Sequence, residues 1–279
     1  MNRVGITLPA DENPGAFARH AEDVGLESVW TGDHLVALAP KLDSTLLLAT
    51  AAATTTRLRL GFGVLILALR PVAWAAKQVA TLQRLSGDRV LLGIGTGGVV
   101  HGDTGWVAAG VPFAERGART DAALEVLPRL VSGQPTNLRG REVQLAPGAT
   151  MPPVLIGGGP AALRRAAKFG HGWYPAFLSP AQLAAAVQDF AGPVTAQVGM
   201  ALGDVPAAAL DAQVRALTGY GMTEEDARQS LLTGGPAQAA ERLAELRAAG
   251  ADRVVGLPFS GDHHRQAELL AEAARRAAG

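Results

Sequence analysis

The chain has 279 residues, a formal net charge of zero, 48% hydrophobic residues and no cysteine. The neutral charge argues against a nucleic acid or another polyanion as partner, and the lack of cysteine excludes disulfides, thiolate metal sites and cysteine nucleophiles. The first residues contain no long apolar segment, and no stretch approaches the roughly 18 apolar residues of a membrane span. We therefore expect a soluble, cytoplasmic protein with no membrane partner.

Short apolar runs alternate with helical patterns along the whole chain. Asn13, Asp43 or Ser44, and Asp262 are predicted helix N-caps, and Gly87 is a predicted C-terminal cap. The predicted strands cover residues 3–8, 28–30, 58–64, 90–93, 154–157, 172–174, 194–200 and 253–257.

Two longer connections interrupt this alternation. After the fourth strand come a polar loop (99–110), a helix from about Phe113 and an excursion (135–147) that is predicted to form a small hairpin. Residues 203–235 are predicted to be helical, with breaks at 219–221 and 234–235. Eight alternating strands without a low-complexity linker favour an α/β fold. We expect a closed (β/α)8 TIM barrel, a single domain over residues 1–279 with the excursion after strand 4.

Glycines gather where two neighbouring predicted strands end. Gly61 and Gly63 lie inside the third strand, where glycine marks a bulge or a close backbone approach. Gly95, Gly97 and Gly98 follow the fourth strand and would let a flat or anionic ligand lie against the backbone. Tight turns are the alternative, but two clusters on neighbouring strands favour a ligand.

A third glycine cluster joins a strand to a helix. Gly157, Gly158 and Gly159 precede Pro160 at the first helical turn. Exposed N–H groups and the helix dipole at such a place favour an anion, typically phosphate. Three glycines are more than a plain turn needs, so the pattern favours phosphate binding.

Histidines are the candidates for proton transfer. His34 follows the second strand beside Asp33 and could act as a general acid or base, with a surface or capping role as the alternative. His101 lies in the loop after the fourth strand, where a substrate or cofactor could meet it. His263 and His264 are adjacent and lack a third ligand, so we expect a solvated helix start there and no metal site.

Two further patterns carry no predicted chemistry. Residues 93–98 match G-x-G-x-x-G, but a polar loop follows in place of a helix, which argues against a dinucleotide site. Glu115, Arg116 and Arg119 are predicted to form a structural charge cluster.

Seven segments follow one another in an order known from one family. They are 27–34 (ESVWTGDH), 51–61 (AAATTTRLRLG), 76–87 (AKQVATLQRLSG), 89–97 (RVLLGIGTG), 110–117 (GVPFAERG), 152–159 (PPVLIGGG) and 235–243 (GPAQAAERL). Together they resemble the bacterial-luciferase-like family of flavin- and deazaflavin-dependent oxidoreductases, over most of the chain.

The resemblance implies a (β/α)8 barrel that holds its cofactor at the C-terminal end, either reduced FMN used with oxygen or coenzyme F420 used for hydride transfer. It places Asp33 and His34 near the cofactor ring, and Gly63 and Val64 at a bulge behind the ring that is often a non-proline cis peptide. Further contacts implied are Gly95, Thr96 and Gly97 along the ring or side chain, and Gly157 to Gly159 at the phosphate end.

The chain departs from one subgroup of this family. Deazaflavin-dependent sugar-phosphate dehydrogenases carry a catalytic glutamate where this chain has Gly98, and an asparagine where it has His101. Neither their substrate nor their proton donor is expected here. His34 is the expected acid or base, and His101 is the second candidate.

The expected function is F420-dependent hydride transfer to or from a small organic substrate. One alternative is an FMN-dependent monooxygenase that uses reduced flavin and oxygen. A second is a non-catalytic barrel that binds a flavin or another phosphate ligand, which Gly98 favours. Barrels of this family often dimerise, so the resemblance also allows a homodimer.

Overall fold

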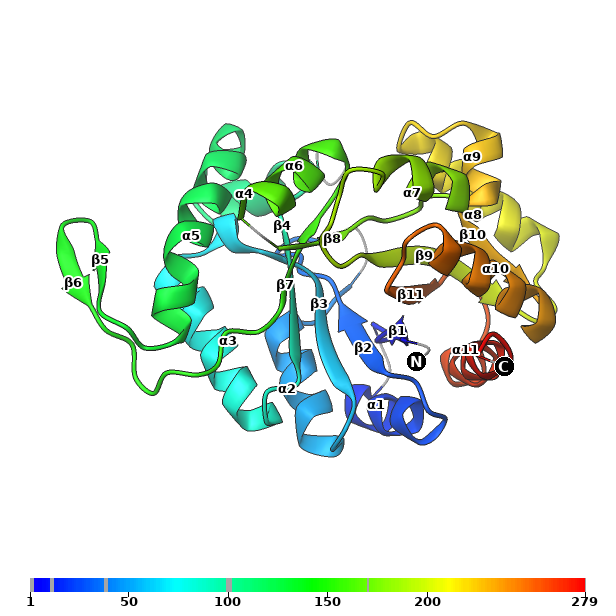
Figure 1. The fold of residues 1–279 in the computed structure, drawn as a ribbon, viewed down its shortest axis with the longest axis horizontal. Coiled ribbons are helices and arrows are strands. Elements are labelled where there is room, and N and C mark those ends of the chain that lie inside the picture. The colour runs from blue at the N-terminus through cyan, green and yellow to red at the C-terminus, as the bar shows by residue number, and fades with distance from the viewer. Residues whose placement is uncertain (1–2, 11–12, 38–39, 99–101, 170, 279) are drawn as a thin grey trace.

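A parallel sheet forms the centre of the protein (Figure 1). The computed structural model describes residues 3–10, 13–37, 40–98, 102–169 and 171–278. Within these, nine strands pair in the order β10-β9-β11-β1-β2-β3-β4-β7-β8. They are β1 (Val4–Thr7), β2 (Ser28–Thr31), β3 (Arg59–Ile66), β4 (Val90–Gly95), β7 (Val154–Gly157), β8 (Gly172–Tyr174), β9 (Thr195–Leu202), β10 (Leu231–Gly234) and β11 (Arg253–Pro258).

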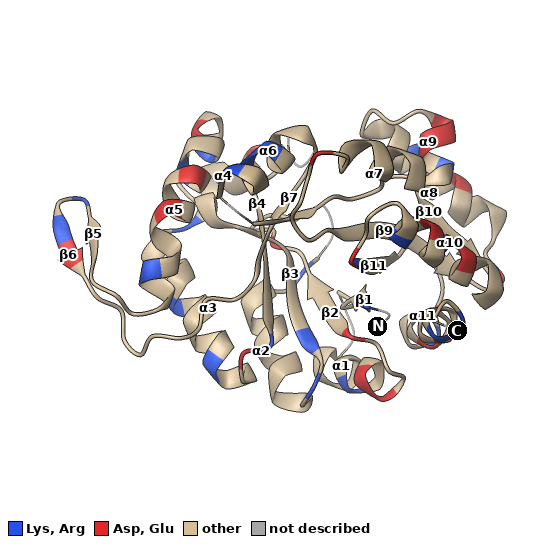
Figure 2. Cartoon of the chain, viewed as in Figure 1, with Lys and Arg blue, Asp and Glu red and all other residues tan. Residues whose placement is uncertain are grey.

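Helices surround this sheet, as Figure 1 shows. They are α1 (Pro14–Asp23), α2 (Ser44–Thr54), α3 (Val72–Ser86), α4 (Thr104–Ala108), α5 (Arg116–Val131), α6 (Pro160–Phe169), α7 (Pro180–Ala186), α8 (Ala207–Gly219), α9 (Glu224–Gln229), α10 (Pro236–Ala248) and α11 (His263–Arg276). Acidic and basic residues are interspersed along the helices, and the strands contain few of them (Figure 2). No helix among the described residues combines the length and the apolar character needed to cross a membrane.

The predicted caps fix where several helices begin and end. Asn13 accepts hydrogen bonds from the first N–H groups of α1 at 3.0 and 3.1 Å. Asp43 and Asp262 cap α2 and α11 in the same way. Gly87 ends α3 in the left-handed conformation (φ 66°), which glycine adopts without a steric penalty. These capping predictions are confirmed.

The core lies between the sheet and the apolar faces of the helices. All six residues of β4 are buried, as expected for a strand covered on both faces. On α3, the predicted inner face is confirmed, since Ala75, Val79 and Leu82 are at most 2% exposed. This packing gives the strand ends a rigid base.

The predicted excursion after β4 is confirmed. It contains α4 and α5, followed by an antiparallel hairpin of β5 (Thr136–Leu138) and β6 (Arg141–Val143). The hairpin projects away from the sheet at the left of Figure 1. The short helix α4 lies inside the segment that was predicted as a loop.

The prediction of helix throughout residues 203–235 is wrong at its end. Residues Leu231–Gly234 form β10, which pairs in parallel with the C-terminal half of β9. Near the start of β9, the described residues form two isolated bridges with the segment that contains β8, Trp173–Val194 and Ala176–Gln197. Val194 precedes β9 and Ala176 follows β8. The predicted parallel α/β class is confirmed, but the regular closed barrel of eight strands is not, because a ninth strand takes part and the β8–β9 ladder is interrupted.

Candidate functional site

A cavity of about 300 Å³ lies at the carboxyl ends of the strands. Most of the site residues predicted from the sequence line it: Asp33, His34, Gly63, Val64, Gly95, Thr96, Gly97, Gly157 and Gly158. Gly98 lines it as well, as do Gly32, Ile66, Tyr174, Ala176 and Gln197. Gly159 is not part of the lining, and His101 lies outside the described residues.

Val64 forms the floor of this cavity together with three glycines, Gly63, Gly95 and Gly157. The Gly63–Val64 peptide bond is cis, and the pairing of β3 with β4 shifts register next to it, as the family resemblance implied. A Cβ atom built on Gly95 would lie 2.3 Å from Cγ2 of Val64, and one built on Gly157 would lie 2.5 Å from its Cγ1. The glycines therefore leave room for the valine and raise no side chain over it, so a planar group can lie on this floor.

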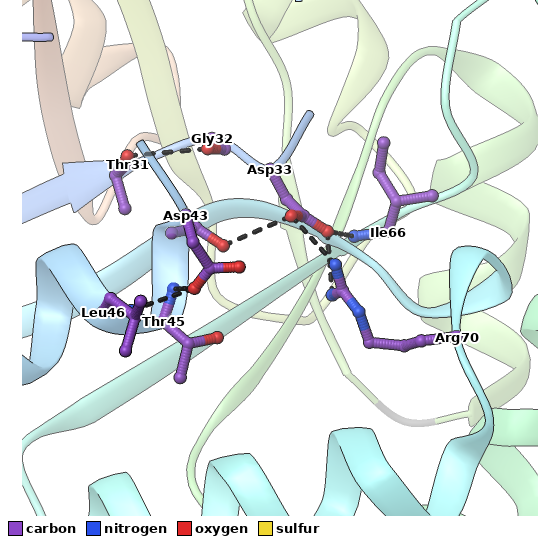
Figure 3. A network of polar contacts seen from close by, with 9 residues as sticks. Thr31, Gly32, Asp33, Asp43, Thr45, Leu46, Ile66 and Arg70 are labelled. Atoms are coloured by element: carbon purple, nitrogen blue, oxygen red, sulfur yellow. Dashed lines mark hydrogen bonds and ion pairs between the residues drawn. The ribbon is translucent and has the colours of Figure 1, made fainter. Parts of the chain in front are cut away.

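The buried side chain of Asp33 binds residues of the segment that follows Val64 (Figure 3). We call Asp33 with these contacts the clamp. Its carboxylate accepts a hydrogen bond from the Ile66 N–H at 3.0 Å and meets both terminal nitrogens of Arg70, at 2.9 and 3.0 Å. Ser44 donates a further hydrogen bond, and the backbone N–H of Asp33 donates to the Val64 carbonyl at 3.0 Å. With both oxygens occupied, this carboxylate is better suited to fixing Val64 and Ile66 than to binding a ligand.

His34 follows the clamp and is half-buried. It lines the main cavity and also a second, smaller cavity of about 30 Å³ toward α4, where Leu69 and Trp106 lie. An imidazole in this place can exchange a proton with a molecule in the main cavity.

Tyr174, at the end of the predicted strand 172–174, and Gln197, inside the predicted strand 194–200, form a polar pair at the cavity wall. No role was predicted for Gln197. The Tyr174 hydroxyl donates to Oε1 of Gln197 at 2.7 Å. Burial raises the pKa of this phenol, although Arg253 works in the opposite direction, so the hydroxyl stays protonated. Gln197 is the only residue of β9 that is not buried. A single glutamine within an apolar strand was the available signal.

The glycine turn after β7 uses part of its own hydrogen-bonding capacity. Gly158 donates to the Tyr174 carbonyl at 3.2 Å, and its carbonyl accepts from the Trp173 indole at 2.8 Å. A Cβ atom on Gly159 would meet no atom within 4 Å. Phosphate binding at this turn therefore depends on the first turn of α6 and stays a prediction.

The residues predicted to be structural lie away from the cavity. His263 and His264 begin α11 and pack edge-on against Phe17, with ring centroids 6.2 and 5.3 Å apart. The described residues contain no group of three or more potential metal ligands. Glu115, just before α5, and Arg119, on α5, form an exposed ion pair of 2.8 Å. Arg116 donates to the Phe113 carbonyl instead, so the predicted cluster of three is present only as this pair.

A parallel α/β sheet with a cavity at the carboxyl ends of its strands defines a class of proteins that bind ligands at this edge. Within this class, the family of luciferase-like monooxygenases is the one whose sequence model matches, over residues 9–228. The chain belongs to this family.

Relatives in sequence carry several names. A Mycobacterium tuberculosis protein named as uncharacterized is 40% identical over 141 residues, 48% of each chain. An F420-dependent glucose-6-phosphate dehydrogenase of Kineococcus radiotolerans is 34% identical over 56% of this chain and 50% of its own. A 4-hydroxyprotoasukamycin monooxygenase of Streptomyces nodosus is 33% identical over 45% and 35%. The matches to these curated relatives span about half of their length or less.

Solved structures share the fold at low sequence identity. An F420-dependent secondary alcohol dehydrogenase superposes with a TM-score of 0.80 at 16% identity, covering 99% of both chains. The oxygenating constituent of 3,6-diketocamphane monooxygenase from Pseudomonas putida, in complex with FMN, gives 0.75 at 16% identity over 98% of both. The likeness at this identity establishes the fold alone.

Proposed function

We propose that the protein is an oxidoreductase that binds coenzyme F420 and transfers a hydride to or from a small organic substrate. The observation that carries the proposal is the floor of Val64 between Gly95 and Gly157, where a Cβ at either glycine would collide with the valine. A surface of this kind, on which the neighbouring glycines place no side chain above Val64, fits a tricyclic ring. Relatives named as F420-dependent support the choice of cofactor.

In this proposal, each part of the cavity binds one part of the cofactor. Val64, Gly95 and Gly157 support the ring, and Thr96 and Gly97 line its edge or its side chain. Gly158, Gly159 and the first turn of α6 hold the phosphate end, because the N-terminus of a helix favours an anion.

When bound, a deazaflavin supplies a hydride acceptor or donor. The side chain of His34 takes or returns, at one ring nitrogen, the proton that the substrate oxygen loses or gains. Asp33 fixes the backbone beside this histidine through Arg70. Tyr174 stays protonated and serves as a hydrogen-bond donor.

Replacement of His34 tests the proton-transfer role. We expect His34→Ala to keep its cofactor affinity and to lose turnover by about 10²–10⁴-fold, the usual contribution of a general acid or base. The matched control is His171→Ala, because this histidine is also half-buried but does not line the cavity. Full turnover by the His34→Ala variant would contradict the proposed role of His34 in proton transfer.

The proposal as a whole is tested by titrating the purified apo-protein with F420 and with FMN, followed by fluorescence. Tight binding of F420 alone supports hydride transfer and justifies a substrate screen. Binding of neither cofactor by the folded protein would contradict the proposal.

Two alternative functions, an FMN-dependent monooxygenase and a non-catalytic binding protein, are each supported by one observation. The family name and a relative named as a monooxygenase favour an FMN-dependent monooxygenase, which would bind FMN and consume oxygen when a flavin reductase is present. Gly98 lines the cavity but contributes no acidic or other side chain to its wall. This favours a non-catalytic barrel that binds a flavin or another phosphate ligand. Tight binding without redox turnover would support the latter.

A further inference from the structure

The polar side chains of the cavity wall differ in how much hydrogen-bonding capacity they retain. The carboxylate of Asp33 is occupied by Arg70, Ser44 and the Ile66 N–H. His34 is assigned to proton exchange. The pair of Tyr174 and Gln197 is the largest remaining polar group, and it lies on β8 and β9 at the far wall of the cavity.

Gln197 is held in place on three sides. Its backbone N–H donates to the Pro175 carbonyl at 2.8 Å, and its carbonyl accepts from the Phe177 N–H at 2.9 Å. Its side-chain oxygen accepts from the Tyr174 hydroxyl at 2.7 Å. The position and the rotation of the carboxamide are therefore both determined by neighbours.

This arrangement leaves one end of the carboxamide for a ligand. The Tyr174 hydroxyl donates to Oε1, so the Nε2 group lies on the side of the carboxamide that faces away from this hydroxyl. Among the described residues, the Nε2 group of Gln197 has no protein partner, while the residue lines the cavity. The wall thus presents an uncharged donor whose orientation is fixed in advance.

The described lining of the cavity offers no lysine or arginine side chain to an anionic substrate. No lysine or arginine is among its described lining residues, and the residues outside the described ranges include none in the sequence. Arg70 is paired with Asp33, and Lys41 lies near Gly32 without lining the cavity. Away from the glycine turn before α6, a phosphate or carboxylate group of a substrate would lack the lysine or arginine partners that normally recognise it.

We infer that Gln197 is a specificity-determining residue. Its amide N–H₂ donates to a carbonyl or hydroxyl oxygen of a small uncharged substrate, and Tyr174 is its positioning residue. This inference rests on the proposed function and deepens it by naming the substrate class. It also sets the chain apart from relatives named for glucose 6-phosphate.

The test uses the holo-protein, loaded with whichever of F420 or FMN it binds. The probes are short secondary alcohols, the corresponding ketones and glucose 6-phosphate. The variants are Gln197→Leu, Gln197→Glu and Tyr174→Phe, with Gln229→Leu on the exposed surface of α9 as the matched control. For each protein we would measure the Kd of the cofactor, the Kd and KM of the probes, and the melting temperature.

We expect wild-type protein to bind and turn over the uncharged probes and to discriminate against glucose 6-phosphate by at least about 100-fold in kcat/KM, because a charge buried without a partner is costly. Gln197→Leu and Gln197→Glu should raise the Kd and KM of the uncharged probes by roughly five- to tenfold, the effect of one lost hydrogen bond. Tyr174→Phe should raise KM with little change in kcat. The Kd of the cofactor and all values for Gln229→Leu should stay unchanged.

Different failures lead to different conclusions. Loss of cofactor binding in wild-type protein would contradict the proposed function, and this inference with it. Intact cofactor binding combined with a preference for glucose 6-phosphate, or with no binding of any uncharged probe, overturns the substrate class alone. If Gln197→Leu lowers only the melting temperature, or weakens only the cofactor, the role in substrate recognition is wrong.

Discussion

At the scale of single residues, Asp33 shows how one buried carboxylate can determine the shape of the cavity that it lines. Its side chain is 4% exposed and that of Arg70 is 20% exposed. Because the carboxylate meets Arg70 and Ile66 while its N–H meets Val64, it ties the end of β2 to the bulge of β3. The position of the floor therefore depends on this ion pair.

Replacing the carboxylate tests this dependence. We expect Asp33→Asn to lower the free energy of unfolding by about 2–3 kcal/mol, since it leaves Arg70 without its counter-charge in a largely buried place. Urea unfolding provides the measurement. Glu115→Gln is the control and should change stability by less than about 0.5 kcal/mol, because its ion pair with Arg119 is exposed. Equal losses of unfolding free energy in the two variants would show that the buried Asp33–Arg70 pair contributes no more to stability than an exposed ion pair.

The sequence predicted the location of these residues better than their roles. Asp33 and His34 stood out as polar residues after a short strand, and both line the cavity. The carboxylate oxygens of Asp33 are occupied by Arg70 and Ser44. Because these residues are distant from Asp33 in sequence, no local pattern could reveal that the carboxylate is occupied. Gln197 was missed because one polar residue in an apolar strand is equally compatible with an interior hydrogen bond.

At the scale of elements, Gly95 of β4 and Gly157 of β7 leave the space that the side chain of Val64 on β3 occupies. We expect Gly95→Ala to destabilise the protein by about 1–3 kcal/mol through overpacking against Val64, and to weaken cofactor binding. Combining it with Val64→Ala should restore part of the stability, since the colliding methyl groups are then absent. Gly159→Ala is the control for stability alone, because a Cβ there meets no atom within 4 Å. Strictly additive effects of Gly95→Ala and Val64→Ala in thermal unfolding would show that the two positions do not share this space.

Most strands could be read from the sequence because they are short apolar runs between recognisable caps. The fifth predicted strand has the observed bounds of β7 (Val154–Gly157), and the sixth those of β8 (Gly172–Tyr174). The strand β10 was missed because Leu231–Gly234 has four residues and follows directly on the helical pattern of α9. A run of that length does not separate a strand from a helix end, and only its pairing with β9 decides between them.

At the scale of the whole molecule, an ion pair at the opposite end of the strands joins the first and last parts of the chain. Arg253, on β11, meets both carboxylate oxygens of Glu27 at 2.7 and 2.9 Å and also donates to Thr195 on β9. Glu27 directly precedes β2, and β1 lies between the two partners in the sheet. The pair therefore links three strands at the base, away from the cavity.

Titration of Glu27 makes this link dependent on pH. Burial alone would raise the pKa of Glu27, but the hydrogen bonds and charge of Arg253, helped by Ser28 and Arg59, outweigh it and hold the pKa below the usual value of 4.5. A carboxyl group with a lowered pKa stabilises the fold above its unfolded pKa, and this contribution is lost as the pH falls through the folded pKa.

We therefore expect Glu27→Gln to lose about 2–4 kcal/mol of unfolding free energy at pH 7, because Arg253 is left largely buried without its partner. The difference from wild-type protein should narrow as the pH falls from 4.5 through the lowered folded pKa, because Glu27 is protonated first in the unfolded chain and then in the folded protein. Urea unfolding at a series of pH values measures both effects. Glu272→Gln is the control, since its pair with Arg276 is exposed and should matter little at any pH. A constant difference across the pH series would mean that packing around Glu27, and not its charge, holds the base of the sheet together.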